Sequence, residues 1–298
     1  MDAIVKLHLV DGTYELFRAH FSKRPDHLAP EGYDAKATIG FAHSMLALLS
    51  DSNEAVTHIA VAFDRPIRSF RNDLFEGYKT DEGVPEELLR QFEPVEEAAA
   101  ALGMTVWVMD RWEADDALAT GAFRFFGDVD QVRILSPDKD LGQCIVGRRV
   151  VQVDRRQGKE VDEDTLRAAK GITPASVPDW LALVGDSADG IPGIKGFGEK
   201  GASALLGMYG TIESIPASAE AWVVKPRGAA QLAATLHAER DRALLYRKLA
   251  TLVRDVPLKE SFDDMRWRGV PRKKFAAWCK KLGADSMLAR PHRWDDAG

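Results

Sequence analysis

The sequence predicts an α/β protein in which a mostly parallel sheet is followed by a smaller all-α module. Short apolar runs rich in Val, Ile, Leu and Phe alternate with helical stretches in the first half of the 298-residue chain, a pattern typical of a parallel sheet covered by helices. From about residue 171 this alternation gives way to helices separated by Gly-rich turns. With 45% hydrophobic and 29% charged residues, the composition is that of a globular protein.

Four apolar runs are the predicted strands of the sheet, and an acidic residue follows each of them. The runs are Ile4–Val10, His58–Phe63, Thr105–Met109 and Val132–Leu135, and the acids are Asp11, Asp64, Glu113 and Asp138. Functional sites in open α/β sheets lie beyond the carboxyl ends of the strands. We therefore expect these carboxylates to meet in one crevice.

Residues 66–95, between the second and third strands, predict a mobile excursion over the sheet because they mix aromatic and charged residues with Gly83 and Pro85. Arg71, Tyr78 and Lys79 of this segment, and Arg18 of the first helix, are candidates for contact with phosphate groups. Solvated side chains on the surface are the alternative interpretation of all four, and the residues alone leave both open.

The change near residue 171, from alternating apolar runs and helices to helices and Gly-rich turns, sets the expected domain boundaries. Residues 1–170 are expected to form the α/β domain, and residues 171–258 a helical domain in which Pro174 suits a first helical turn. Residues 259–298 form a basic segment that we expect to pack back on the α/β domain.

Five further acids complete a set of nine. They are Asp115 and Asp116 in the first turn of a predicted helix, Asp140 beside Asp138, and Asp186 and Asp189 in a Gly-bounded loop. Helix capping and turn formation are the structural alternatives for these acids. A carboxylate set without His or Cys instead suits hard cations such as Mg²⁺ or Mn²⁺, and we favour metal binding.

A Gly-rich turn at residues 190–201 matches the G-x-G-x-x-G pattern of dinucleotide-binding loops, but it lacks the buried strand that must precede such a loop. A turn that joins two helices can instead present backbone N–H groups to a DNA phosphate without reading sequence. On this interpretation the phosphate-binding residues are Gly193, Lys195, Gly196, Gly198 and Lys200.

The net charge of −6 argues at first against a nucleic-acid partner, because phosphates select basic proteins. Leaving out nine metal-binding carboxylates changes that charge to +3, so the argument does not exclude DNA. Two cysteines and no apolar run of membrane-spanning length favour a soluble, cytoplasmic protein that has no membrane partner. We also expect a monomer.

Taken together, the motifs resemble the 5′ nuclease domain of bacterial DNA polymerase I and the flap endonuclease family, nearly from end to end. The matching pieces are Val10-Asp11-Gly12, Phe17-Arg18-Ala19, Ala62-Phe63-Asp64, Ser69-Phe70-Arg71, Tyr78-Lys79, Glu113-Ala114-Asp115-Asp116, Ser136-Pro137-Asp138-Lys139-Asp140-Leu141, and Gly185-Asp186 through Gly201. After Lys79 the polymerase-linked proteins carry a basic segment, whereas this chain has the shorter, acidic Thr80-Asp81-Glu82-Gly83-Val84. The absence of a polymerase region favours a stand-alone nuclease.

The resemblance implies a Rossmann-like, PIN-like nuclease body with a helical arch and a helix-three-turn-helix module, a kind of helix-hairpin-helix, that grips duplex DNA around K⁺. It implies one metal cluster at Asp11, Asp64, Glu113, Asp115 and Asp116, and a second at Asp138, Asp140, Asp186 and Asp189. Arg71 and Lys79 match residues that contact the scissile phosphate region, so the implied catalytic residues are Lys79, Arg71, Asp116 and Asp138.

These residues predict a two-metal 5′-3′ exonuclease or flap endonuclease of DNA repair and replication, which leaves 5′-phosphate and 3′-hydroxyl ends. The expected substrates are DNA 5′ ends, flaps or nicks and RNA primer–DNA hybrids, with a DNA polymerase as partner and the nucleoid as location. Two alternatives are a catalytically inactive DNA-junction-binding protein, which the nine acids disfavour, and a PIN-like ribonuclease, a class that lacks the hairpin. The sequence leaves open the preferred substrate structure, the balance of exonuclease and endonuclease cutting, and threading of a single strand.

Overall fold

The computed structural model describes residues 4–65 and 67–296, and the chain divides by its internal contacts into two compact units. Unit 1 consists of Met1–Ile67, Asp81–Ser136 and Arg254–Gly298, and unit 2 of Arg68–Thr80 and Pro137–Val253. The units are interleaved along the sequence, so they do not test boundaries at residues 170 and 258, and those boundaries stay a prediction.

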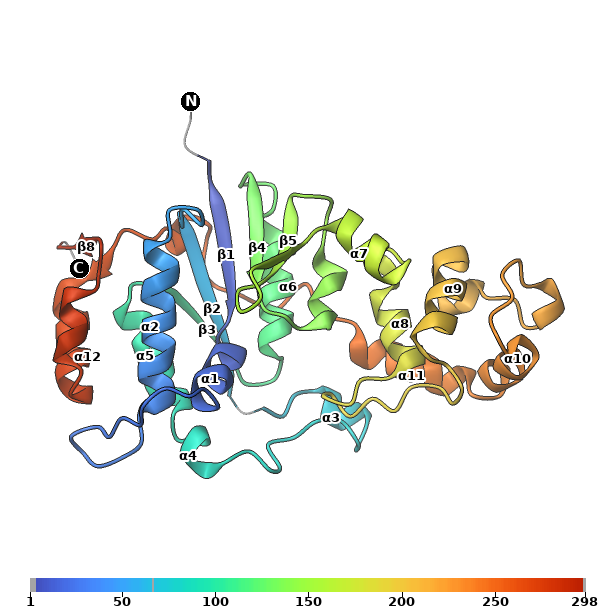
Figure 1. Cartoon of the computed structure of the whole chain (residues 1–298), viewed down its shortest axis with the longest axis horizontal. Helices are drawn as coiled ribbons and strands as arrows, with labels where there is room; N and C mark the ends of the chain where they lie inside the picture. The colour runs from blue at the N-terminus through green and yellow to red at the C-terminus, as the bar shows by residue number, and fades with distance from the viewer. Residues whose placement is uncertain (1–3, 66, 297–298) are drawn as a thin grey trace. The chain divides into compact units, whose positions relative to one another are not determined.

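Unit 1 is built on parallel strands in the order β3-β2-β1-β4 (Figure 1). The strands are β1 (Lys6–Asp11), β2 (His58–Asp64), β3 (Thr105–Met109) and β4 (Gln131–Leu135). They coincide with the four predicted apolar runs to within two residues at each end. The expected mostly parallel sheet is therefore confirmed.

Helices cover both faces of this sheet. The helices of unit 1 are α1 (Gly12–His20), α2 (Lys36–Ser50), α4 (Glu86–Leu89), α5 (Phe92–Ala101), α6 (Ala114–Phe125) and α12 (Arg272–Leu282). A Cβ on Gly121 of α6 would lie 2.8 Å from the ring of Trp107, so α6 packs closely on that face. Phe63 points to the other face, where its ring lies 5.8 Å from that of Phe41 in α2. This two-sided cover explains why β1 and β2 are almost entirely buried.

The C-terminal residues of unit 1 pack on the same sheet and its helices. The backbone N–H of Trp267 donates to Thr57 O at 2.9 Å, and its indole Nε1 donates to Leu102 O at 3.0 Å. The remaining elements are the 3₁₀ helices η5 (Asp263–Met265) and η6 (Asp285–Ala289) and the parallel pair β7 (Val270–Pro271) and β8 (Trp294–Asp295). Across the described residues, every helix is too short or too polar to cross a membrane.

Unit 2 is mainly helical and has its own apolar core, which includes Trp180, Ile194 and Leu205. Its helices are α3 (Arg71–Leu74), α7 (Glu163–Lys170), α8 (Val177–Val184), α9 (Glu199–Tyr209), α10 (Ala229–Ala238) and α11 (Arg240–Ala250). Its 3₁₀ helices are η1 (Lys139–Cys144), η2 (Pro174–Ser176), η3 (Ile212–Ser214) and η4 (Ala219–Ala221). An antiparallel pair, β5 (Val150–Asp154) and β6 (Lys159–Val161), was not among the predicted elements.

The predicted excursion at residues 66–95 has little regular structure, and its first residue, Pro66, lies outside the described residues. It contains α3 and α4, each of four residues, before α5 begins at Phe92. Residues 68–80 belong to unit 2, while residues 81–95 belong to unit 1.

Candidate metal and nucleic-acid site

Asp11 and Asp64 lie at the carboxyl ends of neighbouring strands in unit 1. Asp11 caps α1, because Tyr14 N donates to its Oδ1 at 2.8 Å, and Ser136 Oγ donates to its Oδ2 at 2.8 Å. Asp64 accepts a hydrogen bond at Oδ1 from Ala114 N at 2.8 Å, so its carboxylate touches the first turn of α6. The acidic ends of β1 and β2 and the start of α6 therefore lie at one edge of the sheet, and the meeting of all four acids in one crevice stays a prediction.

The acids of α6 also cap their own helix. Glu113 and Asp116 form a reciprocal capping box, in which Glu113 N donates to Asp116 Oδ2 at 3.0 Å. Asp116 is completely buried, Glu113 nearly so, and Asp115 is half-buried. The capping interpretation is therefore correct for two of these three acids. It does not exclude metal binding, since each carboxylate has two oxygens with several lone pairs.

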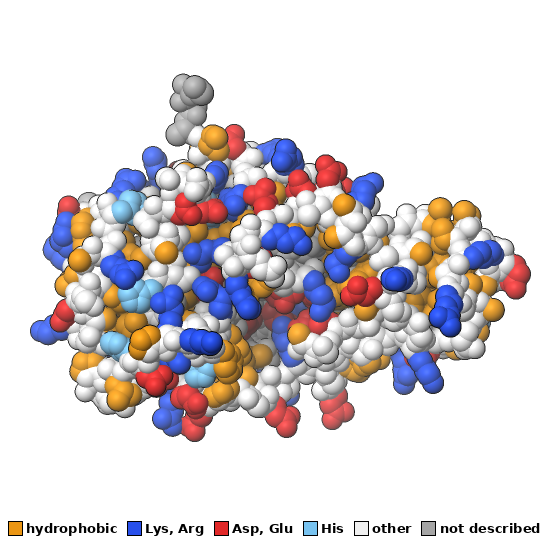
Figure 2. All heavy atoms as spheres, viewed as in Figure 1, with side chains coloured by type: hydrophobic (Ala, Val, Ile, Leu, Met, Phe, Trp, Pro, Cys, Tyr) orange, Lys and Arg blue, Asp and Glu red, His pale blue; other side chains and the backbone are white. Residues whose placement is uncertain are grey.

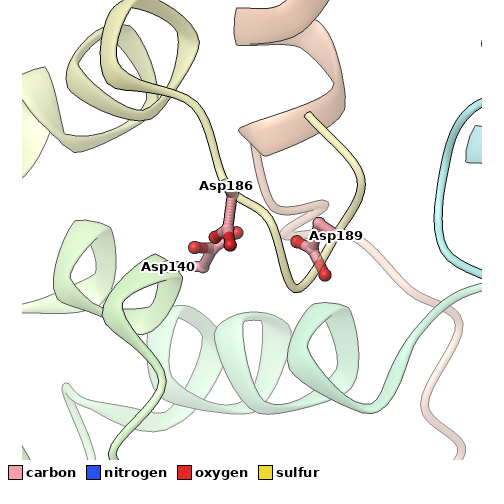
Figure 3. Close-up of side chains that lie close together, drawn as sticks. All are labelled: Asp140, Asp186 and Asp189. Carbon is pink, nitrogen blue, oxygen red and sulfur yellow. The ribbon is translucent and has the colours of Figure 1, made fainter. Parts of the chain in front are cut away.

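Unit 2 brings three predicted metal ligands together (Figure 3). One carboxylate oxygen each from Asp140, Asp186 and Asp189 lies within 4.8 Å of the other two, and all three residues are buried. Asp140 comes from η1, whereas Asp186 and Asp189 come from the loop after α8, in which Asp186 and Ile191 exchange backbone hydrogen bonds of 2.8 Å. Asp138 caps η1 by accepting a hydrogen bond from Asp140 N at 3.0 Å.

Burial and crowding raise the pKa of two acids of the cluster, Asp138 and Asp140. Burial, and then repulsion by Asp138, Asp189 and Asp186, raises the pKa of Asp140 well above its usual range. Burial also raises the pKa of Asp138, although its hydrogen bond from the Asp140 N–H acts in the opposite direction. Two lysines partly balance the cluster, since Lys139 Nζ lies 2.7 Å from Asp186 Oδ2 and Lys79 Nζ lies 2.9 Å from Asp189 Oδ1.

The donor set of this cluster fits a hard divalent cation. All the candidate ligand atoms are carboxylate oxygens, which Mg²⁺ and Mn²⁺ prefer. Asp140 Oδ1 is buried and accepts no hydrogen bond from any described residue. A buried carboxylate oxygen without a donor is costly, and a bound cation would remove that cost.

Lys79 and Tyr78 lie directly beside the cluster in unit 2. Lys79 N donates to Asp189 O at 3.0 Å, so both the backbone and the ammonium group of Lys79 contact Asp189. The ring of Tyr78 is buried in the core of the unit. The solvated surface pair considered from the sequence is therefore wrong for Tyr78.

The two candidate phosphate-binding arginines are both engaged in internal contacts. Arg71 is 1% exposed, and its guanidinium donates to Leu249 O at 2.7 Å and to Thr251 O at 3.1 Å, at the end of α11. The alternative of a helix-surface arginine is therefore wrong for Arg71. Arg18 is half-buried and bonds to Glu15 and to Ser44 Oγ, the latter at 2.8 Å. Phosphate contact by either arginine stays a prediction.

The Gly-rich turn runs from α8 to α9, with no strand immediately before it, so the dinucleotide-loop interpretation is wrong. Its apolar residues, Ile191, Ile194 and Phe197, are buried. Its predicted phosphate-binding residues Lys195, Gly196, Gly198 and Lys200 are exposed, Gly193 is half-buried, and Gly198 caps the N-terminus of the eleven-residue helix α9. Basic and acidic side chains are interspersed on the face drawn in Figure 2.

Three residues near the acids were not among the predicted site residues. Lys139 balances Asp186, Ser136 donates to Asp11, and Asn72 donates through Nδ2 to the backbone carbonyls of Tyr78 and Lys79. Lys139 and Ser136 belong to the Ser136–Asp140 motif, so their closeness in sequence to Asp138 and Asp140 could have identified them as site residues. Asn72 carries no such signal, because an Asn in a short polar segment is an ordinary turn residue.

Comparison with known proteins assigns both parts of the chain. Residues 6–171 match the family described as 5′-3′ exonuclease, N-terminal resolvase-like domain, and residues 172–273 match the 5′-3′ exonuclease, C-terminal SAM fold. DNA polymerase I of Bacillus caldotenax is 34% identical over 289 residues, which cover 96% of this chain and 32% of that protein. The chain thus spans about a third of the length of the relatives it matches.

Two groups of solved structures share the fold. Bacteriophage T5 5′-exonuclease, determined with bound divalent zinc ions, superposes with a TM-score of 0.64 at 18% identity, covering 82% of this chain and 89% of that one. The catalytic core of Rad2, in complex with a DNA substrate, gives a TM-score of 0.59 at 13% identity, covering 96% and 92%. These structures share the fold, and the two family models and the 34% identical relative show that the chain belongs to the 5′-3′ exonuclease family.

Proposed function

We propose that this chain is a structure-specific 5′ nuclease that hydrolyses DNA phosphodiester bonds at 5′ ends, flaps or nicks. The observation that carries the proposal is the buried group of Asp140, Asp186 and Asp189 in a chain of the 5′-3′ exonuclease family. Three carboxylates this close are unfavourable unless a cation or protons neutralise them. A protein that only binds DNA has no need of such a group.

The metal ligands of the proposal form two sets. Asp11, Asp64, Glu113, Asp115 and Asp116 of unit 1 would hold one Mg²⁺ or Mn²⁺, and Asp138, Asp140, Asp186 and Asp189 of unit 2 would hold another. When bound, such cations supply an activated water and stabilise the charge of a leaving 3′ oxygen. The products would then carry 5′-phosphate and 3′-hydroxyl ends.

The chain's own basic groups would stabilise charge and position the DNA. The Lys79 ammonium would turn from Asp189 to the scissile phosphate, because a cation bound at the cluster replaces the charge that Lys79 supplies to Asp189. The exposed N–H groups at the start of α9, with Lys195 and Lys200, would hold a phosphate of the duplex, with K⁺ bound at the same turn. This mode of binding follows DNA shape and is indifferent to base identity.

The proposal also covers the oligomeric state, the location, the protein partner and the hybrid substrates. We expect the protein to act as a monomer in the cytoplasm, on nucleoid DNA, alongside a DNA polymerase. RNA primer–DNA hybrids are expected substrates, because phosphate contacts made through the backbone do not require a particular sugar.

The test is cleavage of matched 5′-labelled substrates in Mg²⁺ and in EDTA. A 5′ flap, a nicked duplex, a blunt duplex and a single strand should be compared, each with a free and with a blocked 5′ end. We expect cutting of the flap or nick in Mg²⁺ only, with products that ligase can seal. Blocking the 5′ end should inhibit cutting if the single strand threads.

Asp138→Asn provides the matched variant, because it removes one negative charge at constant size. It should abolish cutting in Mg²⁺ while duplex binding in a gel shift is preserved. Full activity of this variant would remove the second ligand set from the proposal. Metal-dependent cutting of RNA alone would favour a ribonuclease, and binding without any cutting by the wild-type protein would favour a non-enzymatic junction binder.

A further inference from the structure

Asn72 joins the two ends of a short segment of unit 2 that leads to Lys79. Its Oδ1 accepts a hydrogen bond from Ser69 N at 2.9 Å, before α3. Its Nδ2 donates to Tyr78 O at 3.3 Å and to Lys79 O at 3.0 Å, after α3. One carboxamide therefore closes the loop of residues 69–79.

The opposite side of this segment docks on the loop that carries Asp189. Lys79 N donates to Asp189 O at 3.0 Å, and Lys79 Nζ lies 2.9 Å from Asp189 Oδ1. Gly190 has φ of +72°, and a Cβ placed on it would lie only 2.1 Å from Gly77 O. The two backbones are so close that residue 190 must be glycine, and any displacement of residues 77–79 changes the position of Lys79 relative to Asp189.

Holding the Lys79 ammonium in one place costs conformational entropy, which the contacts of its loop must offset. Its flexible side chain loses about 2 kcal/mol of rotamer entropy when it is held in one geometry, and each backbone residue fixed in a loop costs about 1–2 kcal/mol. Residues 75–79 follow the four-residue helix α3 and form no further helix or strand. The hydrogen bonds of Asn72 compensate for part of this entropy.

We propose that Asn72 is a positioning residue for Lys79, and that its two N–H donors set the place of the Lys79 ammonium beside the acidic cluster. This inference rests on the proposed function, in which Lys79 stabilises charge at the scissile phosphate. Asn72 is assigned no contact with DNA or metal. It acts through the carbonyls of Tyr78 and Lys79.

Asn72→Asp tests the inference with an isosteric change. The aspartate keeps an acceptor for Ser69 N, but it loses both N–H donors and places a negative oxygen against two carbonyl oxygens. We expect kcat for flap cleavage in Mg²⁺ to fall by about tenfold to a hundredfold, as for a small misplacement of a reacting group, with duplex affinity unchanged. Asn72→Ala, which removes the donors without adding charge, should give a smaller loss and guards against misfolding of the aspartate variant.

The double variant with Lys79→Ala separates positioning from general structural damage. If Asn72 acts only through Lys79, Asn72→Asp causes no further loss of kcat in the Lys79→Ala background. An equal loss in both backgrounds would overturn the inference. Gln231→Glu, the same amide-to-acid change at an exposed site on α10, is the matched control and should leave kcat unchanged.

The outcomes distinguish this inference from the proposed function. If Lys79→Ala lowers kcat and Asn72→Asp does not, the positioning role is wrong while the nuclease assignment stands. If Lys79→Ala has full activity, the role of Lys79 is wrong and the inference fails with it. If the wild-type protein shows no metal-dependent cleavage, the proposed function itself fails.

Discussion

Asp140→Asn should stabilise the metal-free protein while it weakens cation binding at the cluster of Asp140, Asp186 and Asp189. The folded state raises the pKa of Asp140, so its ionised form is unfavourable in the cluster. At an effective dielectric constant of about 20, two unit charges separated by the cluster's limiting distance of 4.8 Å repel by about 3.5 kcal/mol. Lys79 and Lys139 attract the same cluster, and partial protonation of Asp140 limits the repulsion further. We therefore expect a gain of about 1–3 kcal/mol in the free energy of unfolding, or about 2–4 °C in Tm for each kcal/mol.

The gain in stability from Asp140→Asn should become smaller as the pH falls. A carboxyl whose pKa is raised in the folded state contributes stability below its unfolded pKa, and that contribution is lost as the pH rises through the folded pKa. Asp140 follows this rule, whereas asparagine does not titrate. The Tm difference between variant and wild type in EDTA should therefore be largest near neutral pH and should shrink as the pH falls towards the unfolded value of about 3.8.

Thermal melting with added Mg²⁺ or Mn²⁺ completes the experiment. A cation at one hundred times its dissociation constant stabilises the folded state by about 2.7 kcal/mol. The wild-type protein should therefore gain more from added cation than the variant, whose ligand set in unit 1 is unchanged but whose cluster in unit 2 has lost a carboxylate. Asp162→Asn is the matched control, because Asp162 caps α7 and the hydrogen bonds from Thr165 lower its pKa. That variant should gain nothing in EDTA. A metal-free Asp140→Asn protein that melts at or below the wild-type temperature would refute the account of a repulsive cluster.

Two further predictions concern the partly buried ion pair of Glu54 and Arg133 and the Gly-rich turn. Hydrogen bonds from His8 and then Arg133 lower the pKa of Glu54 to about 2, so Glu54→Gln should cost up to about 3 kcal/mol at pH 7 in urea unfolding. The stability that ionised Glu54 contributes is present above its unfolded pKa of about 4.5 and is lost as the pH falls towards 2. The difference in the free energy of unfolding between wild type and Glu54→Gln should therefore vanish over this range. A difference that stays constant with pH would contradict the role of Glu54. Gly193→Ala should lower Tm, because the φ angle of Gly193 is +73° and an added Cβ would lie 2.6 Å from Gly185 N. Gly198 has open space around the position of a Cβ. Gly198→Ala should therefore preserve Tm but weaken duplex binding in a gel shift. Unchanged binding by Gly198→Ala would remove this residue from the phosphate contact.

The parallel sheet was predictable because helices cover both of its faces, so its strands are rich in Val, Ile, Leu and Phe even where Lys6, His8 or Arg133 interrupts a run. The helices of unit 1 supply that cover, as the contacts of Phe63 and Trp107 on opposite faces illustrate. The β5–β6 pair was not predictable by the same rule. Lys159 and Glu160 of β6 are exposed, so this strand lacks both an apolar run and a clear alternation, and backbone pairing with β5 alone defines it.

The candidate site was predictable as a set of residue types, and the structure adds the contacts among them. Proximity of Asp140 to Asp186 and Asp189 depends on the loop after α8, which the Asp186–Ile191 backbone pair closes. Nothing in the chain order of these acids specifies that closure. Asn72 could not be predicted for the same reason, because its role depends on which backbone carbonyls accept hydrogen bonds from its amide, and the sequence does not specify these contacts.

Arg71 illustrates how burial changes the meaning of a motif. Its position in the Ser69-Phe70-Arg71 motif indicates a cation near the phosphate, and a cation on a flexible excursion would be expected to face solvent. The structure instead places its guanidinium on the carbonyls of Leu249 and Thr251, at the end of α11 where the helix dipole is negative. Arg71 therefore ties residues 69–79 to α11, within the unit that holds Asp140, Asp186 and Asp189. Its loss would remove the donor that Arg71 provides to the carbonyl of the buried Leu249, so a fall in activity after substitution of Arg71 would not by itself identify a phosphate contact.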